Sequence, residues 1–333
     1  MSLARFKPDP FLMALFATVA LASVFPARGS GADLLEIATN LAIALLFFLY
    51  GARLAPQAAL DGLKHWRLHG LVVAVTFLVF PALVLGLRAA LPELLPAPLW
   101  TGLIYLSVLP STVQSSIAFT SIAGGNVPAA LCAATLSNLL GMIVTPLLTA
   151  LLLTPQGHGV SAGALGDILL HLMLPFAAGQ AARPLIGDWL ARHKRILGPV
   201  DRSSILLVVY TAFGEGVKQG IWQQIGWTQL AILAAVNLAL LGVLLAGTTG
   251  LSRLLGFSRA DEIAIVFCGS KKSLASGLPM AGILFAGPQV GMVVLPLMLF
   301  HQIQLIACAV LAKRYAKAGT AQALPVAAAP AEG

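Results

Sequence analysis

The chain has 333 residues, of which 59% are hydrophobic and 10% are charged, and its mean hydropathy is +0.92. Soluble domains contain about 25% charged residues, so this composition excludes a soluble globular protein and leaves no room for a sizeable soluble domain. The formal net charge is +8, which we attribute to orientation in a lipid bilayer rather than to binding of nucleic acid.

Apolar segments follow one another along the chain, each near the length of about 20 residues that a bilayer requires. The first, at about 11–26, follows Arg5 and Lys7 and resembles a signal peptide, but many apolar segments come after it, so we expect a retained helix. Nine further spans are predicted at about 34–52, 70–91, 98–124, 127–154, 163–186, 196–218, 227–252, 260–286 and 288–314. The Ala- and Pro-rich tail, 318–333, is predicted to be disordered and cytoplasmic.

The basic residues test this count of ten spans, which would place both termini on one side. Fifteen of the 20 lysines and arginines fall on the side of the termini, and only Arg28, Arg88 and Lys218 fall on the other. Positive charge stays cytoplasmic, so we expect a multi-pass protein with both termini in the cytoplasm. A missed or extra span would destroy this asymmetry.

The remaining two lysines, Lys271 and Lys272, lie in the middle of an apolar segment, within the run CGSKKSLASGLP at 268–279. A lysine at mid-depth costs about 2.5–3.5 kcal/mol to insert, and such residues usually face an ion or substrate path. The surrounding Gly and Pro predict a broken helix, which a bilayer tolerates only where protein or a water-filled cavity satisfies the backbone. Broken helices at the midplane are typical of transporters.

A second polar break lies in the fourth span, from Pro110 to Ser116, and it predicts an internal repeat. The run QSSIA at 114–118 aligns with KKSLA at 271–275, an offset of 157, and LYGA at 49–52 aligns with VYTA at 209–212, an offset of 160. Two halves of five spans have opposite orientations, so the fold class expected is an all-α membrane protein with two inverted repeats. Their bounds are about 9–155 and 163–315, within a transporter domain at 9–317.

These residues resemble the bile acid:sodium symporter family. The resemblance covers about 9–315. It rests on the ten-span layout, on the broken fourth span leading into 124–148, and above all on the run GSKKSLASGLP. This run looks like the branch of the family that contains sodium/bile acid cotransporter 7-like proteins and bacterial members. The resemblance implies a panel domain of spans 1, 2, 6 and 7, a core domain of spans 3–5 and 8–10, and spans 4 and 9 that unwind and cross. It also implies the inner membrane of a bacterium.

One departure from the family alters its sodium site. The resemblance implies the following pattern for the sodium-coupled members of the family. Their ninth span carries an acidic residue, a glycine and then a Gln-Asn pair, and these residues help to hold sodium. Aligned on Gly269, this chain has Phe267 in place of the acid and Lys271 and Lys272 in place of the pair, and Ser115-Ser116 match a Ser-Asn pair. Ammonium groups would repel a cation there, so no metal site is predicted and the coupling ion is left open between proton and sodium.

The lysines have three alternative roles in this position. They can hold the crossing permanently, bind an anionic substrate, or exchange a proton, because burial disfavours the charged form of an amine. The residues predicted to line the substrate and ion path are Thr112, Gln114, Ser115, Ser116, Asn138, Ser270, Lys271, Lys272, Ser273 and Ser276. Taken singly, a membrane Ser or Thr more often joins helices.

Four further polar residues are secondary candidates: Glu215, Asn237, His301 and Gln302. Glu215 is more simply explained as a partner for Lys218, one turn later. The three cysteines, Cys132, Cys268 and Cys308, lack metal-ligand spacing and are interpreted as buried structural residues.

The function predicted is secondary active transport of an organic anion, bile-acid-like or otherwise amphipathic, by alternating access. The alternative is a non-transporting membrane regulator that keeps the fold and uses the lysines as a static lock. No phosphate loop, nucleotide motif or catalytic constellation is present, so we expect neither an enzyme nor a cofactor.

Overall fold

The computed structural model describes residues 10–53, 65–153, 162–218, 220–285 and 289–323, and within these ranges the chain is helical, with no strand. The helices in chain order are α1 (Pro10–Val24), α2 (Ser30–Arg53), α4 (Trp66–Ala74), η2 (Val75–Val79), α5 (Phe80–Ala90), η3 (Pro92–Leu94), α6 (Ala97–Ser107), α7 (Gln114–Ile122), α8 (Val127–Leu153), α9 (Ala162–Arg192), α10 (Lys194–Lys218), α11 (Ile221–Gln224), α12 (Trp227–Leu254), α13 (Arg259–Gly269), α14 (Leu274–Leu284) and α15 (Gln289–Ala323).

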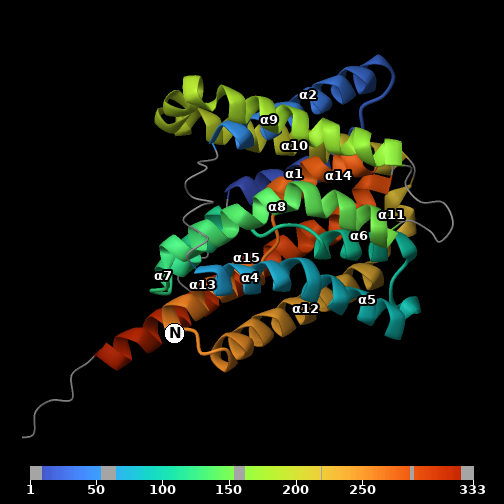
Figure 1. The fold of residues 1–333 in the computed structure, drawn as a ribbon. Helices are drawn as coiled ribbons and strands as arrows, with labels where there is room; N and C mark the ends of the chain where they lie inside the picture. The colour runs from blue at the N-terminus through green and yellow to red at the C-terminus, as the bar shows by residue number, and fades with distance from the viewer. Residues whose placement is uncertain (1–9, 54–64, 154–161, 219, 286–288, 324–333) are drawn as a thin grey trace, which may run out of the picture.

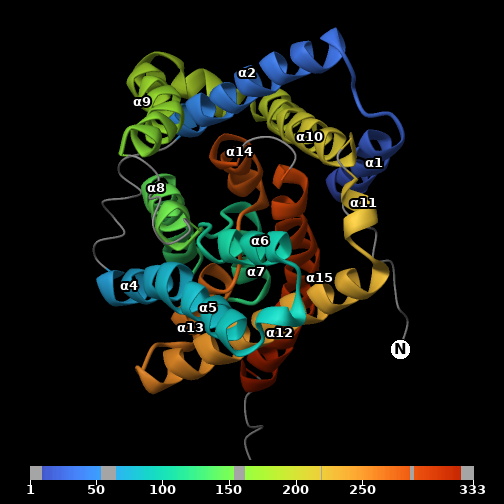
Figure 2. The same cartoon turned by 90° about the vertical axis from the view of Figure 1, so that its right-hand side faces the viewer.

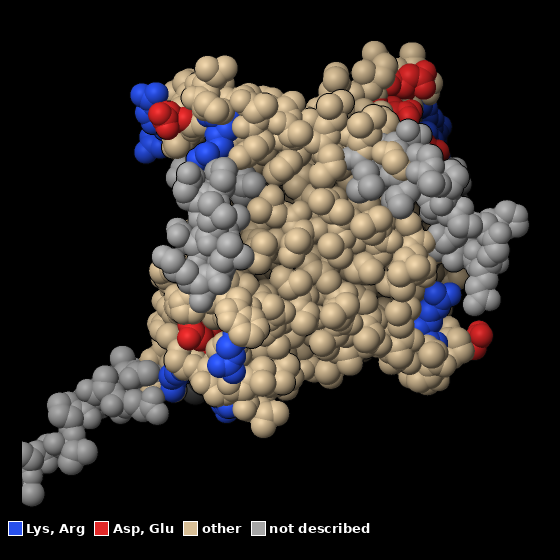
Figure 3. Space-filling model, in the orientation of Figure 1, with Lys and Arg blue, Asp and Glu red and all other residues tan. Residues whose placement is uncertain are grey.

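Six of these segments are long and apolar enough to cross a membrane: α2, the continuous run from α4 to α5, α8, α10, α12 and α15. The charged side chains gather at the left and right edges of the molecule in Figure 3, near the helix ends, and the described surface between the edges is uncharged on this face. This distribution fits helices that run through an apolar layer with their ends in water.

Helices α2, α9 and α10 lie at the top of Figures 1 and 2, and α1 packs against α10; we refer to these four helices as the four-helix layer. Helices α2 and α9 touch through glycine: a Cβ on Gly51 would overlap the carbonyl oxygen of Phe176, and one on Gly179 would overlap that of Phe48. Small residues let membrane helices approach closely and pack by van der Waals contact. The layer is joined further by the Arg53–Asp201 ion pair at 2.6 Å.

The remaining helices form a larger body below the layer, in which α6 and α15 pack closely. Gly102 on α6 makes this possible, since a Cβ there would lie 2.6 Å from the carbonyl oxygen of Val293 and 2.8 Å from Cγ of Pro296. The core around them is built from buried apolar side chains, among them Leu99, Leu103, Leu106, Leu109, Val293, Leu297 and Phe300.

The helix from α4 to α5 contains a π-helical turn, η2, whose cause is visible in the sequence. The N–H of Phe80 donates to the carbonyl of Val75, five residues earlier. The next nitrogen belongs to Pro81, which has no N–H, so it cannot donate to the carbonyl of Thr76. The turn therefore leaves the Thr76 carbonyl available to another part of the chain.

The carboxyl-terminal helix differs from its prediction. Helix α15 continues to Ala323, so residues 318–323 are helical, although we predicted a disordered tail from Ala318. The run AGTAQA contains three alanines, which favour continuation of a helix already formed by Leu311–Lys317. The remainder of the predicted tail, 324–333, lies outside the described residues.

Candidate functional site

Helices α6 and α7 are separated by a non-helical segment, 108–113, that contains Pro110. Proline opens the hydrogen-bond ladder of a helix, and side chains of α8 replace the missing partners here. Thr145 Oγ1 donates to the carbonyl of Val108 at 2.7 Å, and Asn138 Nδ2 donates to that of Ser111 at 2.6 Å. The Ser111 N–H donates to Ser137 Oγ at 3.0 Å. The break is therefore satisfied by protein, as a membrane interior requires.

Helices α13 and α14 are separated by a second non-helical segment, 270–273, which contains both lysines. Gln304 of α15 holds the backbone of Lys272 at both sides, accepting from its N–H at 2.9 Å and donating to its carbonyl at 2.9 Å. Ser273 then begins α14 as an N-cap, accepting from the N–H of Ser276 at 3.1 Å.

The two non-helical segments meet, and we call their meeting place the crossing (residues 108–113 and 270–273). The N–H of Ser273 donates to the carbonyl of Pro110 at 2.9 Å. Nearby, Ser116 Oγ donates to the carbonyl of Phe267 at 2.9 Å, and Ser276 Oγ donates to Asn138 Oδ1 at 2.8 Å. Residues 138 to 163 positions apart in the sequence thus share one polar interior.

The ammonium group of Lys272 is fully buried at the crossing and donates to three backbone carbonyls. They belong to Thr76 at 2.7 Å, Ser107 at 2.5 Å and Leu109 at 2.7 Å. The first is the carbonyl freed by Pro81, and the other two lie at the carboxyl end of α6, where the helix dipole favours a cation. Nζ also lies 4.7 Å from the centre of the Phe80 ring. All three N–H bonds of the ammonium have acceptors.

Lys271 is equally buried but is held differently. Its Nζ donates to Ser115 Oγ at 3.0 Å and lies 4.6 Å from the centre of the Phe119 ring and 5.9 Å from that of Phe267. Ser115 Oγ lies 2.7 Å from Thr112 Oγ1, so Lys271 joins a chain of hydroxyl groups. One hydroxyl and two rings hold a cation less firmly than three carbonyls do.

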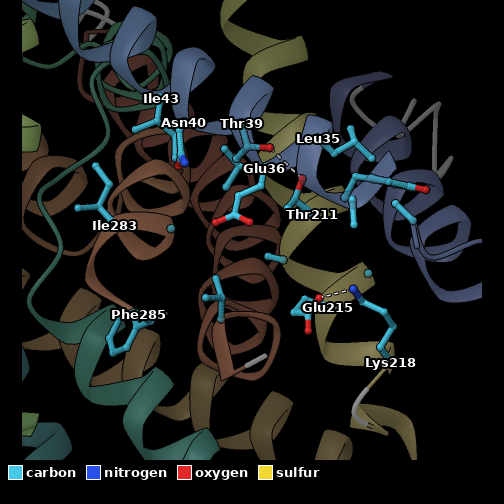
Figure 4. Close-up of a pocket in the computed structure, with 18 residues that line it drawn as sticks. Leu35, Glu36, Thr39, Asn40, Ile43, Thr211, Glu215, Lys218, Ile283 and Phe285 are labelled. Carbon is cyan, nitrogen blue, oxygen red and sulfur yellow. Dashed lines mark hydrogen bonds and ion pairs between the residues drawn. The ribbon is translucent and has the colours of Figure 1, made fainter. Parts of the chain in front are cut away.

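A cleft of about 460 Å³ lies between the four-helix layer and the body, and we call it the α2–α10 cleft. In Figure 4 the carboxylate of Glu36 points into it, Thr39 and Thr211 are joined by a hydrogen bond of 2.8 Å, and Glu215 forms an ion pair with Lys218. Apolar side chains complete the wall, among them Leu35, Ile43, Val208, Ile283 and Phe285. Helix α14 thus begins at the crossing and ends at the cleft.

Known proteins resemble this chain over nearly its whole length. Residues 9–317 match the SBF-like CPA transporter family. The chain belongs to this family. It is 54% identical to an uncharacterized protein of Pseudomonas aeruginosa, over 99% of both chains. YfeH of Escherichia coli, whose name marks it as a candidate symporter, is 51% identical over 92% of each chain. Sodium/bile acid cotransporter 7 of Mus musculus is 30% identical over 93% of each.

Family membership makes this chain a membrane protein of a transporter family and not an enzyme, as the sequence predicted. Most of the predicted path residues lie in the crossing or form hydrogen bonds with its residues: Thr112, Ser115, Ser116, Asn138, Lys271, Lys272, Ser273 and Ser276. Ser270 also lies in the crossing, but its Oγ donates back to the carbonyl of Val266 in α13 at 2.6 Å. Gln114 is exposed at the start of α7.

The secondary candidates of this transporter fall in different places. His301 Nδ1 lies 2.8 Å from Gln304 Nε2 and so touches the crossing indirectly. Asn237 on α12 donates to the carbonyl of Pro296 at 3.1 Å and joins two helices. The amide atoms of Gln302 are buried without a hydrogen-bond partner among the described residues. Glu215 pairs with Lys218, the simpler of its two interpretations, and both line the cleft.

Sequence reasoning missed several groups that shape the site in this transporter. The carbonyls of Thr76, Ser107 and Leu109 have no sequence signal, because every residue carries a carbonyl. Glu36 had a signal: it is one of only 12 acidic residues and lies inside a predicted span.

Proposed function

We propose that this protein is a secondary active transporter that moves an organic anion by alternating access, and that Lys272 takes the place of a bound cation. The observation that supports this most directly is the ammonium of Lys272 inside three carbonyl oxygens at the crossing. Rings of carbonyls are the ligands that alkali cations receive in membrane proteins. A tethered ammonium supplies the same charge permanently.

The proposal includes ten membrane spans in two inverted repeats. Helices α6 and α13 have 11 residues each, and each is followed by a polar break and a second short helix. Paired broken helices whose breaks meet are a property of inverted-repeat transporters. The four-helix layer, α1, α2, α9 and α10, corresponds to spans 1, 2, 6 and 7 and would be the panel domain; the larger body would be the core domain.

The orientation proposed has both termini in the cytoplasm of a bacterium and the protein in the inner membrane. It is supported by the distribution of basic residues, of which only three flank the opposite ends of the spans. In this orientation the α2–α10 cleft faces away from the cytoplasm, because its lining includes Ala27, Lys218 and Phe285 from those opposite ends.

Substrate would enter the α2–α10 cleft, whose mixed apolar and polar lining suits an amphipathic molecule. The carboxyl end of α14 lines the cleft, and the amino end of α14 follows the crossing. A movement of the body against the layer would therefore change the cleft and displace the crossing at the same time. The layer already touches α14 at the other end, where Tyr50 donates to the carbonyl of Ala275 at 3.2 Å. Rocking of one bundle against the other is the usual form of alternating access.

The two lysines would have different roles in this mechanism. Lys272 has an acceptor for each N–H and would be a fixed charge, whereas Lys271 donates to a hydroxyl at the end of a hydroxyl chain and would exchange the coupling proton. A second candidate function is a non-transporting regulator. The complete coordination of Lys272 favours this function, because a lysine that only fixes the crossing in one arrangement needs no contact with a substrate or an ion.

Flux through reconstituted protein separates these functions. Proteoliposomes would be loaded with a labelled organic anion such as cholate, and the proton and sodium gradients imposed independently. We expect saturable uptake that follows the proton gradient and loses that dependence in Lys271→Gln, with the exposed Lys313→Gln as the matched control. Proton dependence that survives in Lys271→Gln would remove its coupling role. Absence of flux with any organic anion would favour the regulator.

A further inference from the structure

A second cavity, of about 490 Å³, lies at the other charged end of the molecule, between the ends of α12, α13 and α15. Three arginines line it, one from each helix, and we call it the arginine pocket. Its lining consists of Thr249 and Arg253 from α12, Arg259 and Glu262 from α13, and Leu311, Arg314, Tyr315 and Ala318 from α15. No role in transport follows from these residues, which lie away from both the crossing and the α2–α10 cleft.

The base of the arginine pocket is a fixed network around Glu262, which is only 5% exposed. Arg253 donates to both of its carboxylate oxygens, from Nε at 2.9 Å and from Nη2 at 3.1 Å. The Tyr315 hydroxyl donates to Oε1 at 2.8 Å. This bidentate pairing neutralises the one carboxylate in the pocket and joins the ends of three helices.

The pocket is lined by two more arginines than carboxylates, because Arg259 and Arg314 lie beside the Arg253–Glu262 pair. Arg259 is fixed in place, since Nη2 donates to the carbonyl of Tyr315 at 3.0 Å and the guanidinium lies 5.9 Å from the centre of the Tyr315 ring. Arg314, one residue before Tyr315, lines the pocket and is exposed. Figure 3 shows Lys and Arg gathered at the lower left edge of the molecule, over the ends of these helices, beside the uncharged surface.

We propose that the arginine pocket binds the phosphate group of an anionic phospholipid. Arginine presents a planar set of N–H donors that matches phosphate, and basic pockets between membrane helices at the cytoplasmic surface hold lipid head groups. The apolar Leu311 and Ala318 in the wall distinguish a lipid from free phosphate as the source. The location at the cytoplasmic leaflet rests on the orientation given under Proposed function.

A lipid in this pocket would act on the first half of the broken helix. Arg259 is the first residue of α13, and α13 ends at Gly269, directly before the segment that carries the two lysines. A phosphate shared by Arg259 and Arg314 would tie α13 to α15 in addition to the Glu262 network. The lipid would therefore stabilise one arrangement of the crossing from outside it.

The binding test needs no transport measurement. Purified full-length protein would be titrated with short-chain phosphatidylglycerol, with the matching phosphatidylcholine and with inorganic phosphate, and binding followed by thermal shift. Of these three ligands, only phosphatidylglycerol should raise the melting temperature of the wild type. Arg314→Gln should weaken the apparent affinity of the protein for phosphatidylglycerol about fivefold, since each basic residue near an anionic surface contributes about that factor. The double variant, which carries Arg259→Gln as well as Arg314→Gln, should bind more weakly still.

Arg88→Gln is the matched control, because Arg88 is an exposed arginine at the end of α5, outside this pocket. Melting of each variant in phosphatidylcholine reports whether the fold itself has changed. Equal shifts with both lipids, or an unchanged affinity in the double variant, would overturn the proposal. A shift with inorganic phosphate equal to that with phosphatidylglycerol would overturn the lipid as its source. None of these outcomes depends on whether the protein transports a solute.

Discussion

Gln304 holds both backbone polar groups of Lys272 in the unwound segment between α13 and α14, with its Oε1 2.9 Å from the nitrogen and its Nε2 2.9 Å from the oxygen. A backbone segment without helical hydrogen bonds cannot remain unpaired in an apolar interior. One amide on α15 replaces the two missing partners and fixes the lysine between α15 and the helix pair α6–α7.

Removal of this amide should therefore destabilise the protein. Gln304→Leu leaves the N–H and carbonyl of Lys272 buried without partners, which costs about 1–3 kcal/mol for each group. We expect a lower melting temperature in detergent for Gln304→Leu. Gln302→Leu is the matched control on the same helix, because the amide of Gln302 is buried without a partner among the described residues, and its loss should be neutral or stabilising. A larger loss in the Gln302 variant would contradict the assignment.

The contact between α2 and α9 gives a prediction for the four-helix layer. Gly51→Ala should destabilise the protein by about 1–3 kcal/mol, as overpacking in a close contact does, because the new Cβ would overlap the carbonyl oxygen of Phe176. Gly70→Ala in α4 is the control: its Cβ would meet nothing within 4 Å, and alanine is the better helix former. Thermal melting of the two variants should move in opposite directions. Equal shifts would mean that the helices can separate without cost.

Sequence alone located the two breaks and the buried lysines, because Pro110, Lys271 and Lys272 are conspicuous inside apolar segments. It did not identify which lysine is fully coordinated. That depends on the Thr76 carbonyl, which is available because Pro81, just after the π-helical turn, has no N–H to donate to it. A proline at 81 signals a distortion, but the direction of the freed carbonyl is set by packing in three dimensions.

The α2–α10 cleft was also beyond sequence reasoning. Glu215 and Lys218 were paired correctly from their spacing, since neighbours on one helix face are a local property. Glu36 and Thr211 come from helices that are distant in the chain, and only the packing of α2 on α10 brings them to one wall. Periodicity gives the spans of such a protein, whereas the surfaces between spans require the fold.

Glu36 predicts how the cleft responds to the charge of its substrate. Its carboxylate points into the cleft and would repel an organic anion there. At an effective dielectric constant near 20, repulsion at about 10 Å amounts to about 1.7 kcal/mol, reduced by salt in the open cleft. Glu36→Gln should therefore lower the apparent KM for an organic anion by about threefold to tenfold. Exposed Glu93→Gln, in η3, is the control. A raised KM would indicate that the substrate carries positive charge.

Substitution of Lys272 by a small residue tests whether its ammonium takes the place of a cation. Lys272→Ala would leave the carbonyls of Thr76, Ser107 and Leu109 without a donor in a buried space, at a cost of about 3–5 kcal/mol. Because sodium can be held by such oxygens, sodium chloride should raise the melting temperature of this variant more than choline chloride does at the same ionic strength. The wild type should respond equally to both salts.

Lys271→Ala is the control, since one hydroxyl and two rings form no oxygen cage. A sodium-specific shift of the same size in the wild type, or none in Lys272→Ala, would show that the ammonium does not replace a cation.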